Sequence, residues 1–192
     1  MRSLLVAILF LSLLAVGCTP DSHVPVTIYT SEGTIDVDID TVAAPRTSAN
    51  FLRYARESFY DGGSFFRVVR MDNQPTDSIF IEVIQGGANL DQERDFYDPI
   101  DLERTTETGL MHFDGTISMA RGGPNSATHS FFFTIGDQHS LDFGGKRIAD
   151  GQGFAAFGRV SEGMDVVRAI QSGDVDAQIL VEPVTIDSVR VR

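Results

Sequence analysis

Apolar and polar residues alternate along two neighbouring stretches, residues 26–30 and 34–40, with Ser31-Glu32-Gly33 between them. A period of two is typical of a strand with one buried face, and the glycine-containing link predicts a β-hairpin. Six further runs are short, rich in β-branched or aromatic residues, and bounded by glycine or polar residues. They cover residues 64–69, 81–87, 116–120, 131–135, 154–160 and 184–191. The pattern therefore predicts about eight strands.

Two stretches have helical spacing instead. Ala44-Pro45 begins the first, because proline is tolerated in the first turn of a helix, and apolar residues recur from Phe51 to Ala55. A second helix is predicted from Met164 to Ile170. The order of elements lacks the strand–helix–strand rhythm of a parallel sheet. We therefore expect a mainly β fold, an eight-stranded antiparallel closed barrel capped by two α-helices.

Two segments lack a regular pattern. Residues 71–80 are mostly polar and predict an exposed excursion between two strands, and residues 88–114 form a long polar stretch with few strand signals. A loop of the second length inside a compact domain is usually either functional or hides an element that the pattern does not show.

One arginine lies among apolar residues in the run 64–69. A period of two places Arg67 on the face shared with Phe65 and Val69, and leaves Phe66 and Val68 to face a core. In the run 81–87, the same alternation places Gln85 with Ile81 and Val83, and Ile84 on the core side. Antiparallel pairing of the two runs would bring the guanidinium beside the amide of Gln85. The expected result is a fixed cation on a partly apolar surface.

Length and charge limit the classes of function. A chain of 192 residues fits one domain with a substantial core. The net charge is −12 and the sequence has no cluster of Lys and Arg, which argues against a nucleic-acid partner.

Metal and hydrolase sites are not indicated. The four histidines share no ligand spacing with each other or with the single cysteine, so no metal site is expected. These are His23, His112, His129 and His139. Ser130 follows His129, but adjacent strand residues point to opposite faces and no nucleophile elbow surrounds them.

An acidic run, from Asp91 to Glu103, leaves calcium binding open as a weaker alternative to a solvated loop. The run lacks the glycine that an EF-hand loop needs at its sixth position, where Phe96 stands.

The N-terminus has the features of an export signal. Met1-Arg2 precedes an apolar run from Leu4 to Val16, which is shorter than the about 20 residues that span a bilayer. The run ends in Leu14-Ala15-Val16-Gly17-Cys18, which resembles a bacterial lipobox, so Cys18 is the expected lipidation site. An ordinary signal peptide with an incidental Cys18 is the alternative. Several acyl chains would anchor the protein stably.

The expected domains follow from these signals. Residues 1–17 form the signal peptide, residues 18–25 the lipidated cysteine with a short tether, and residues 26–192 the folded domain. The protein is then expected to be exported and lipid-anchored to a bacterial membrane, facing the periplasm or the cell exterior.

Several motifs, taken in order, resemble the cyclophilins over nearly all of residues 26–192. They are Phe65-Phe66-Arg67-Val68-Val69, Ile84-Gln85-Gly86-Gly87, Ser118-Met119-Ala120 through Gly123-Pro124-Asn125-Ser126, Ser130-Phe131-Phe132-Phe133, Leu141-Asp142 and Phe157-Gly158-Arg159-Val160. The resemblance implies the cyclophilin barrel and peptidyl-prolyl cis–trans isomerase activity without a cofactor. It implies proline-containing segments of exported polypeptides as partners, and we expect a monomer.

The resemblance also implies roles for single residues. Arg67 matches the family's catalytic arginine. The expected substrate-binding residues are Gln85, which orients the arginine, with Val83, Ala120, Arg121, Phe132, Leu141 and Phe154. By alternation Phe132 faces a pocket, whereas its neighbours Phe131 and Phe133 face the core.

Some positions depart from the family's pattern. Ser130 stands where glutamine is frequent, Ser140 where some members have tryptophan, Glu82 in place of a pocket phenylalanine, and Phe154 in place of a histidine. A cyclophilin fold that binds peptides with little catalysis is therefore the main alternative function. A barrel that carries an apolar ligand inside, as lipocalins do, is a more distant one.

Overall fold

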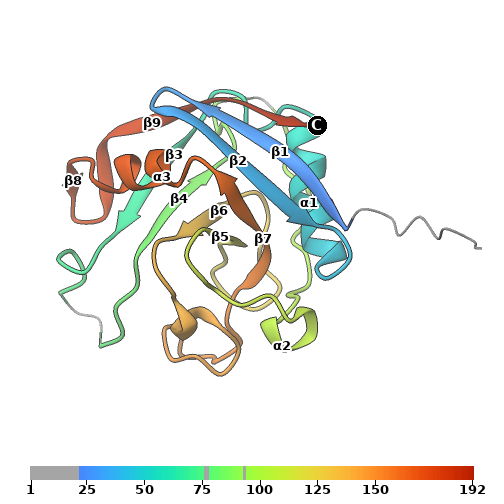
Figure 1. The fold of residues 1–192 in the computed structure, drawn as a ribbon, viewed down its shortest axis with the longest axis vertical. Helices are drawn as coiled ribbons and strands as arrows, with labels where there is room; N and C mark the ends of the chain where they lie inside the picture. The colour runs from blue at the N-terminus through green and yellow to red at the C-terminus, as the bar shows by residue number, and fades with distance from the viewer. Residues whose placement is uncertain (1–21, 76–77, 93) are drawn as a thin grey trace, which may run out of the picture.

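The computed structural model describes residues 22–75, 78–92 and 94–192. Eight antiparallel strands close into a barrel with the order β1-β2-β7-β5-β6-β4-β3-β9, and β9 pairs with β1 to complete the ring. The expected mainly β, eight-stranded barrel is confirmed. A ninth strand of two residues, β8, pairs with β9 beside the barrel (Figure 1).

The strands agree with the hydrophobic pattern within a few residues. Their bounds are β1 His23–Thr30, β2 Gly33–Asp40, β3 Gly63–Val69, β4 Val83–Gly87, β5 Thr116–Met119, β6 Phe131–Thr134, β7 Ala155–Glu162, β8 Val175–Asp176 and β9 Ile179–Val191. β1 and β2 form the expected hairpin, in which Ile28 pairs with Ile35. β1 begins at His23, so the last three residues of the expected tether are part of a strand. Cys18 and the rest of the predicted signal and tether before residue 22 lie outside the described residues.

Helices α1 (Pro45–Arg56) and α3 (Met164–Gln171) lie on opposite sides of the barrel (Figure 1). α1 contacts β9, β2 and β7, whereas α3 contacts β2, β3 and β4. Both predicted helices are therefore present. The described residues also contain the four-residue helix α2 (Thr105–Thr108), and the short 3-10 helix η1 (His139–Leu141), neither of which the pattern predicted.

The N-terminus of α1 is bound by a residue of the acidic run. The Glu103 carboxylate accepts hydrogen bonds from the backbone N–H groups of Arg46 and Thr47, at 3.1 and 2.7 Å. These groups have no partner within the helix, and a negative charge is favourable at this end of the helix dipole. Within the part of the chain that the structure describes, no three His, Cys, Asp or Glu side chains form a metal-binding group. Glu103 thus has a structural role.

The barrel interior is filled by apolar side chains. The largest are aromatic, and several meet edge to face: Phe131 lies 5.4 Å from Phe51 and 5.8 Å from Phe65, at interplanar angles of 86° and 85°. All three are fully buried, with Phe133 and Phe157 beside them. A barrel filled in this way has no room for an internal ligand, which argues against the lipocalin-like alternative.

A β-bulge in β3 changes the predicted alternation around Arg67. The register of β3 shifts between Phe65 and Arg67 in its pairing with both β4 and β9. Phe65 is consequently in the barrel core with Val68, and Phe66 is only partly buried. The predictions that Phe65 shares the face of Arg67 and that Phe66 faces the core were wrong, because the bulge inserts one residue between them.

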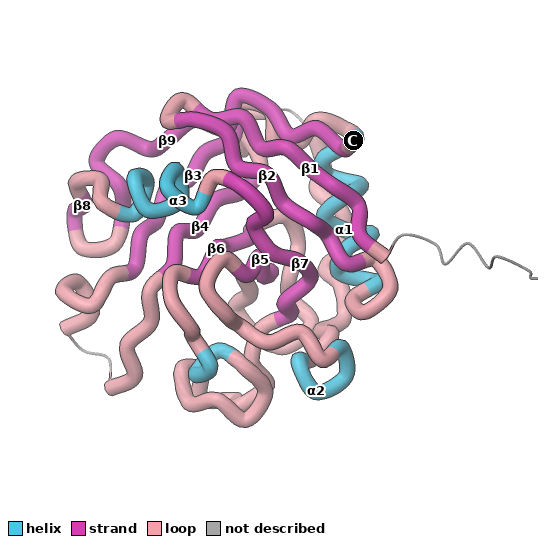
Figure 2. Tube along the Cα trace, viewed as in Figure 1, coloured by secondary structure: helices cyan, strands magenta, loops and turns pink. Residues whose placement is uncertain are grey.

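Long loops gather at one end of the barrel. Figure 2 shows the connections that carry α2 and the 3-10 helix together below β5, β6 and β7, away from β1 and β2. Residues 88–114, the least regular part of the sequence, are mostly loop here as well. This end of the molecule flanks the groove that holds the candidate site.

Candidate functional site

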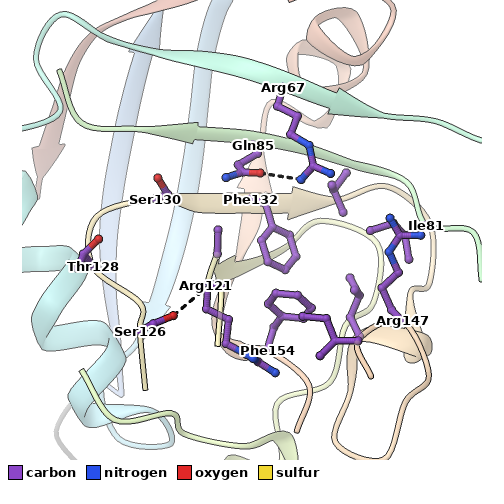
Figure 3. Close-up of a pocket in the computed structure, with 15 residues that line it drawn as sticks. Arg67, Ile81, Gln85, Arg121, Ser126, Thr128, Ser130, Phe132, Arg147 and Phe154 are labelled. Carbon is purple, nitrogen blue, oxygen red and sulfur yellow. Dashed lines mark hydrogen bonds between the residues drawn. The ribbon is translucent and has the colours of Figure 1, made fainter. Parts of the chain in front are cut away.

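A groove of about 550 Å³ lies on the outer face of β3, β4 and β6. Figure 3 shows Arg67 and Gln85 above the rings of Phe132 and Phe154, with Ile81 and Arg147 at one end and Ser126 and Thr128 at the other. Its lining is Arg67, Ile81, Val83, Gln85, Ala120, Arg121, Gly122, Ser126, Thr128, Ser130, Phe132, Leu141, Arg147, Ile148 and Phe154. Every groove residue expected from the sequence is in this set.

Strand register places the central side chains in one row. Arg67 of β3 pairs with Gln85 of β4, and Gln85 pairs with Phe132 of β6. Residues directly opposite in neighbouring strands project from the same face, so a cation, an amide and an aromatic ring stand side by side. Nη1 of Arg67 donates a hydrogen bond to Oε1 of Gln85 at 3.0 Å. The amide thereby fixes the direction of the guanidinium.

The floor of the groove is a small apolar cluster separate from the barrel core. Its buried members are Val69, Ile81, Val83, Phe132 and Leu141, with Ala120 and Phe154 packed against them. Phe132 is 5% exposed and Leu141 only 1%. Such a concave apolar surface beside a few polar groups is the usual form of a small-ligand site.

The loop after Leu141 brings Phe154 back onto the floor. Gly153 has a φ of 67°, and a Cβ there would lie 2.6 Å from the carbonyl carbon of Asp142, so only glycine fits this approach. The backbone N–H of Phe154 then donates to the carbonyl of Leu141 at 2.9 Å. As a result the Phe154 ring meets that of Phe132 edge to face, at 5.3 Å.

Arg121 braces the same loop. Nε donates to the carbonyl of Gly153 at 2.8 Å, and both Nη atoms donate to the Asp150 carboxylate at 2.8 and 2.9 Å. The hydrogen bonds from Arg121 lower the pKa of Asp150. The guanidinium also lies over the Phe154 ring, 5.1 Å from its centre. Arg121 thus lines the groove and holds the loop that carries Phe154.

A buried hydrogen-bonded chain supports the floor from behind. Nδ1 of His112 contacts Oδ1 of Asp142 at 2.7 Å, Nε2 of His112 contacts Oγ of Ser118 at 3.0 Å, and Nδ1 of His139 contacts Oδ2 of Asp142 at 2.9 Å. The His112 ring stacks on Phe132, with 6.0 Å between centres. Burial by itself raises the pKa of Asp142, but the hydrogen bonds from the two histidines outweigh it, so the pKa is lowered.

The hydrogen-bonded group of Asp142, His112 and Ser118 has the residue types of a hydrolase triad, but its serine is not accessible to a substrate. Ser118 and His112 are both 0% exposed, so the serine hydroxyl has no path to a substrate. No sequence pattern indicated the group, because the contact between His112 and Asp142 that joins its two halves spans 30 positions. Its location assigns it to holding Phe132 and the Leu141–Asp142 segment in place.

The expectation that His129 and Ser130 point to opposite faces assumed a strand, but β6 begins only at Phe131. They precede β6, and Oγ of Ser130 lies 3.4 Å from Nδ1 of His129, which also accepts the backbone N–H of Ala88 at 3.2 Å. Burial lowers the pKa of His129. Nδ1 serves here as an acceptor that ties Ala88 to the loop before β6.

A comparison with family models matches residues 25–191 to the cyclophilin type peptidyl-prolyl cis-trans isomerase/CLD family. The chain belongs to this family. Peptidyl-prolyl cis–trans isomerase cyp18 of Streptomyces antibioticus is 37% identical over 174 residues, which cover 86% of this chain and 97% of that protein. Peptidyl-prolyl cis–trans isomerase B of Escherichia coli K12 is 34% identical over 147 residues, or 76% of this chain and 83% of that protein. Family and relatives make this chain an enzyme of the peptidyl-prolyl isomerase class.

Solved cyclophilin structures share the fold. A cyclophilin-type isomerase of Cryptosporidium parvum superposes with a TM-score of 0.71 at 18% identity, covering 88% of this chain and 98% of that one. A second structure of it, in the presence of the dipeptide Ala-Pro, gives a TM-score of 0.70.

The lining of the cyclophilin groove includes residues that sequence reasoning did not select, and Ile81 is one of them. Glu82, which stands in place of a pocket phenylalanine, does not line the groove, and its Oε1 accepts a hydrogen bond from Gln171 at 3.2 Å. Ile81 supplies the apolar surface instead and is 6% exposed. Its alternation with Val83 and Gln85 was the available signal. Ser130 lines the groove and Ser140 does not.

The excursion between β3 and β4 also contacts a residue that lines the groove, Arg147. Nη1 of Arg147, at the end of the groove, donates to Oε1 of Gln74 at 3.0 Å and to the carbonyl of Ile79 at 2.6 Å. Gln74 is buried although it lies in a segment expected to be exposed. The excursion is therefore joined to the loop that carries Arg147.

Proposed function

We propose that this cyclophilin isomerises X-Pro bonds in exported polypeptides, with Arg67 as the catalytic residue and the apolar floor as the proline site. The observation that carries the proposal is the juxtaposition of Arg67, fixed by Gln85, with the Phe132 ring in one groove. The Ala-Pro dipeptide present with the Cryptosporidium cyclophilin supports a proline-containing substrate.

The chemistry requires no cofactor. Amide resonance opposes rotation with a barrier of about 18–20 kcal/mol, and the two isomers of an X-Pro bond exchange over tens to hundreds of seconds. A catalyst must favour the twisted amide, whose nitrogen regains a lone pair. The Arg67 guanidinium can hold the proline carbonyl and donate towards that nitrogen, and it stays charged because the pKa of arginine is above 12.

Arg67 accounts for only part of the expected acceleration. One charge-assisted hydrogen bond contributes about 1.5–3 kcal/mol, which corresponds to roughly one or two decades of rate. The remainder is assigned to the floor. Phe132, Leu141 and Phe154 would hold the pyrrolidine ring and exclude water, which strengthens the field of the cation.

The test is exchange NMR on an Ala-Pro-Phe-type peptide, with the full-length chain kept in detergent. We expect the parent protein to accelerate cis–trans exchange, and Arg67→Ala and Arg67→Lys to lose most of that acceleration while remaining folded. Near-parent exchange by folded Arg67→Ala would remove Arg67 from the mechanism. Peptide binding without exchange in the parent would instead favour the peptide-binding module.

We also propose that the enzyme is exported and held at a bacterial membrane by lipid on Cys18. The support is the sequence alone, namely the apolar run from Leu4 to Val16 followed by the single cysteine. Among the described residues, no helix has the length and apolar character needed to cross a membrane. Mass spectrometry of the mature protein should find an N-terminal Cys18 with a diacylglyceryl group, and none in Cys18→Ser. An unmodified N-terminus beyond Cys18 would contradict the anchor.

A further inference from the structure

A second glutamine contacts Arg67 from the side opposite Gln85. Oε1 of Gln178 accepts hydrogen bonds from Nε of Arg67 at 3.1 Å and from Nη2 at 2.5 Å. Because Gln85 binds Nη1, the two amides together contact all three nitrogens of the guanidinium. Contacts at both edges fix the plane of the group as well as its direction.

The amide of Gln178 is itself oriented. Its Nε2 donates to the backbone carbonyl of Asn73 at 3.2 Å. Only the amide nitrogen can donate to a carbonyl, and only the amide oxygen can accept from a guanidinium, so chemistry settles which end faces Arg67. Asn73 in turn donates from Nδ2 to the carbonyl of Val68 at 3.0 Å, beside Arg67 in β3. The excursion between β3 and β4 thus anchors the second glutamine.

The backbone around Gln178 is placed with similar precision. Ala177 and Gln178 form the two-residue turn between β8 and β9, which Asp176 and Ile179 close as a pair. The carbonyl of Gln178 accepts the backbone N–H of Val68 at 2.8 Å. Ala177 has a φ of 56°, a left-handed conformation that is unfavourable for a residue with a Cβ. Backbone strain of this kind persists where the surrounding structure requires it.

Gln85 and Gln178 both accept through neutral amides, so these two contacts do not neutralise the positive charge of Arg67. Arginine has a long side chain that loses rotamer entropy when it is fixed. A guanidinium that is already fixed before the substrate binds does not lose this freedom during the reaction.

We propose that Gln178 is a positioning residue for Arg67, which fixes the plane of the guanidinium towards the proline site. This inference rests on the proposed catalytic role of Arg67. Sequence reasoning did not select Gln178, because it lies 111 positions from Arg67 and belongs to a turn with no recognisable motif.

The test compares Gln178→Ala and Gln178→Met with Gln171→Ala in the full-length chain. Methionine keeps the length and packing of the side chain but has no amide. Gln171 is a matched control, because its side chain also makes an amide hydrogen bond next to the groove, to Glu82, without a contact to Arg67. The readouts are kcat and KM for the proline peptide and the Nε–H NMR signal of Arg67, which Arg67→Lys identifies by its loss.

We expect both Gln178 variants to lower kcat about three- to tenfold with KM little changed, because Arg67 loses its two hydrogen bonds to Oε1 of Gln178 but keeps its contact with Gln85. The Arg67 Nε–H signal should shift and broaden in both, and stay at the parent position in Gln171→Ala. In the Arg67→Ala background, Gln178→Ala should cause no further loss of rate.

An unchanged Nε–H signal and kcat in Gln178→Met would overturn the proposal, as would an equal loss of rate in the Arg67→Ala background. The NMR signal does not depend on turnover. A parent protein without isomerase activity but with a Gln178-dependent signal would therefore contradict the proposed function while leaving the contact itself established.

Discussion

The inner and outer faces of β3, β4 and β6 are built from neighbouring residues but differ in chemistry. In β6, Phe131 and Phe133 point into the barrel and are fully buried, whereas Phe132 between them forms the floor of the groove. In β4, Ile84 points inward and Gln85 outward. The interior is a continuous set of apolar contacts, and the outer face places a cation beside a shallower apolar cluster.

The two faces separate residues that hold the fold from residues that are expected to act on a substrate. An interior ring has neighbours on all sides, so its loss leaves a cavity. A ring on the outer face is supported from behind and open towards the groove, so its loss removes a surface that a substrate would contact. The following predictions test this separation, in decreasing order of effect.

Phe133→Ala should lower the free energy of unfolding by about 3–5 kcal/mol, because it leaves a cavity among the rings of the barrel. Thermal or urea unfolding checks this. The fraction that remains folded should keep its parental kcat/KM, since Phe133 does not line the groove. A mutant of parental stability would show that the interior rearranges around the loss.

Phe132→Ala, one residue away, should act mainly on activity. We expect kcat/KM to fall by about 10- to 100-fold, because burying an apolar group of this kind contributes about 1.5–3 kcal/mol. Stability should fall less than in Phe133→Ala. Equal losses of stability in the two variants, with activity retained in Phe132→Ala, would contradict the separation of faces.

Asp142→Asn tests the buried chain that supports Phe132. The pKa of Asp142 is lowered by its histidine contacts despite the opposing effect of burial. A lowered folded pKa stabilises the protein above the unfolded value of about 3.9, and this contribution is lost as the pH falls through the folded pKa. We expect the free energy of unfolding of Asp142→Asn to be about 1–3 kcal/mol lower than that of the parent protein at pH 7. This difference between the two proteins should become smaller below about pH 4. A gap that is independent of pH would contradict the role of the charge.

Gln85→Ala should have the smallest effect. Arg67 loses its contact with Gln85 but keeps those with Gln178, so we expect roughly a threefold to tenfold lower kcat, with the free energy of unfolding almost unchanged. A matched comparison is Gly86→Ala on the inner side, where a Cβ would lie 2.8 Å from the Phe65 ring. That variant should lose stability and keep the kcat of its folded fraction.

Periodicity predicted much of this fold because strands with one buried face leave a regular signal. It located the first hairpin, both capping helices and the outward direction of Phe132. It misplaced Phe65 and Phe66, because a bulge adds one residue and shifts the alternation without changing residue type. It also missed the helix α2 and the buried position of Gln74, which depend on contacts with segments far along the chain.

The sequence likewise predicted some residues of the candidate site and missed others. The ordered motifs identified Arg67, Gln85 and the floor residues, since each lies in a run whose residue types are recognisable by themselves. Arg147 and Gln178 have no such run, and their positions follow from how the excursion and the β8–β9 turn fold back on β3. Ile81 lies in the run 81–87 but was not selected as a site residue.

Local patterns along the chain were enough to predict the eight barrel strands, an export signal, and a cation beside the amide of Gln85 on one sheet face. These features follow from side-chain type and from periods of two and 3.6 residues, which are local properties of the chain. The filled barrel interior, the support of the floor by Asp142 and the second amide that holds Arg67, that of Gln178, came instead from contacts made on folding. Each of these joins residues that are distant in the sequence, as His112 meets Asp142 and Arg67 meets Gln178.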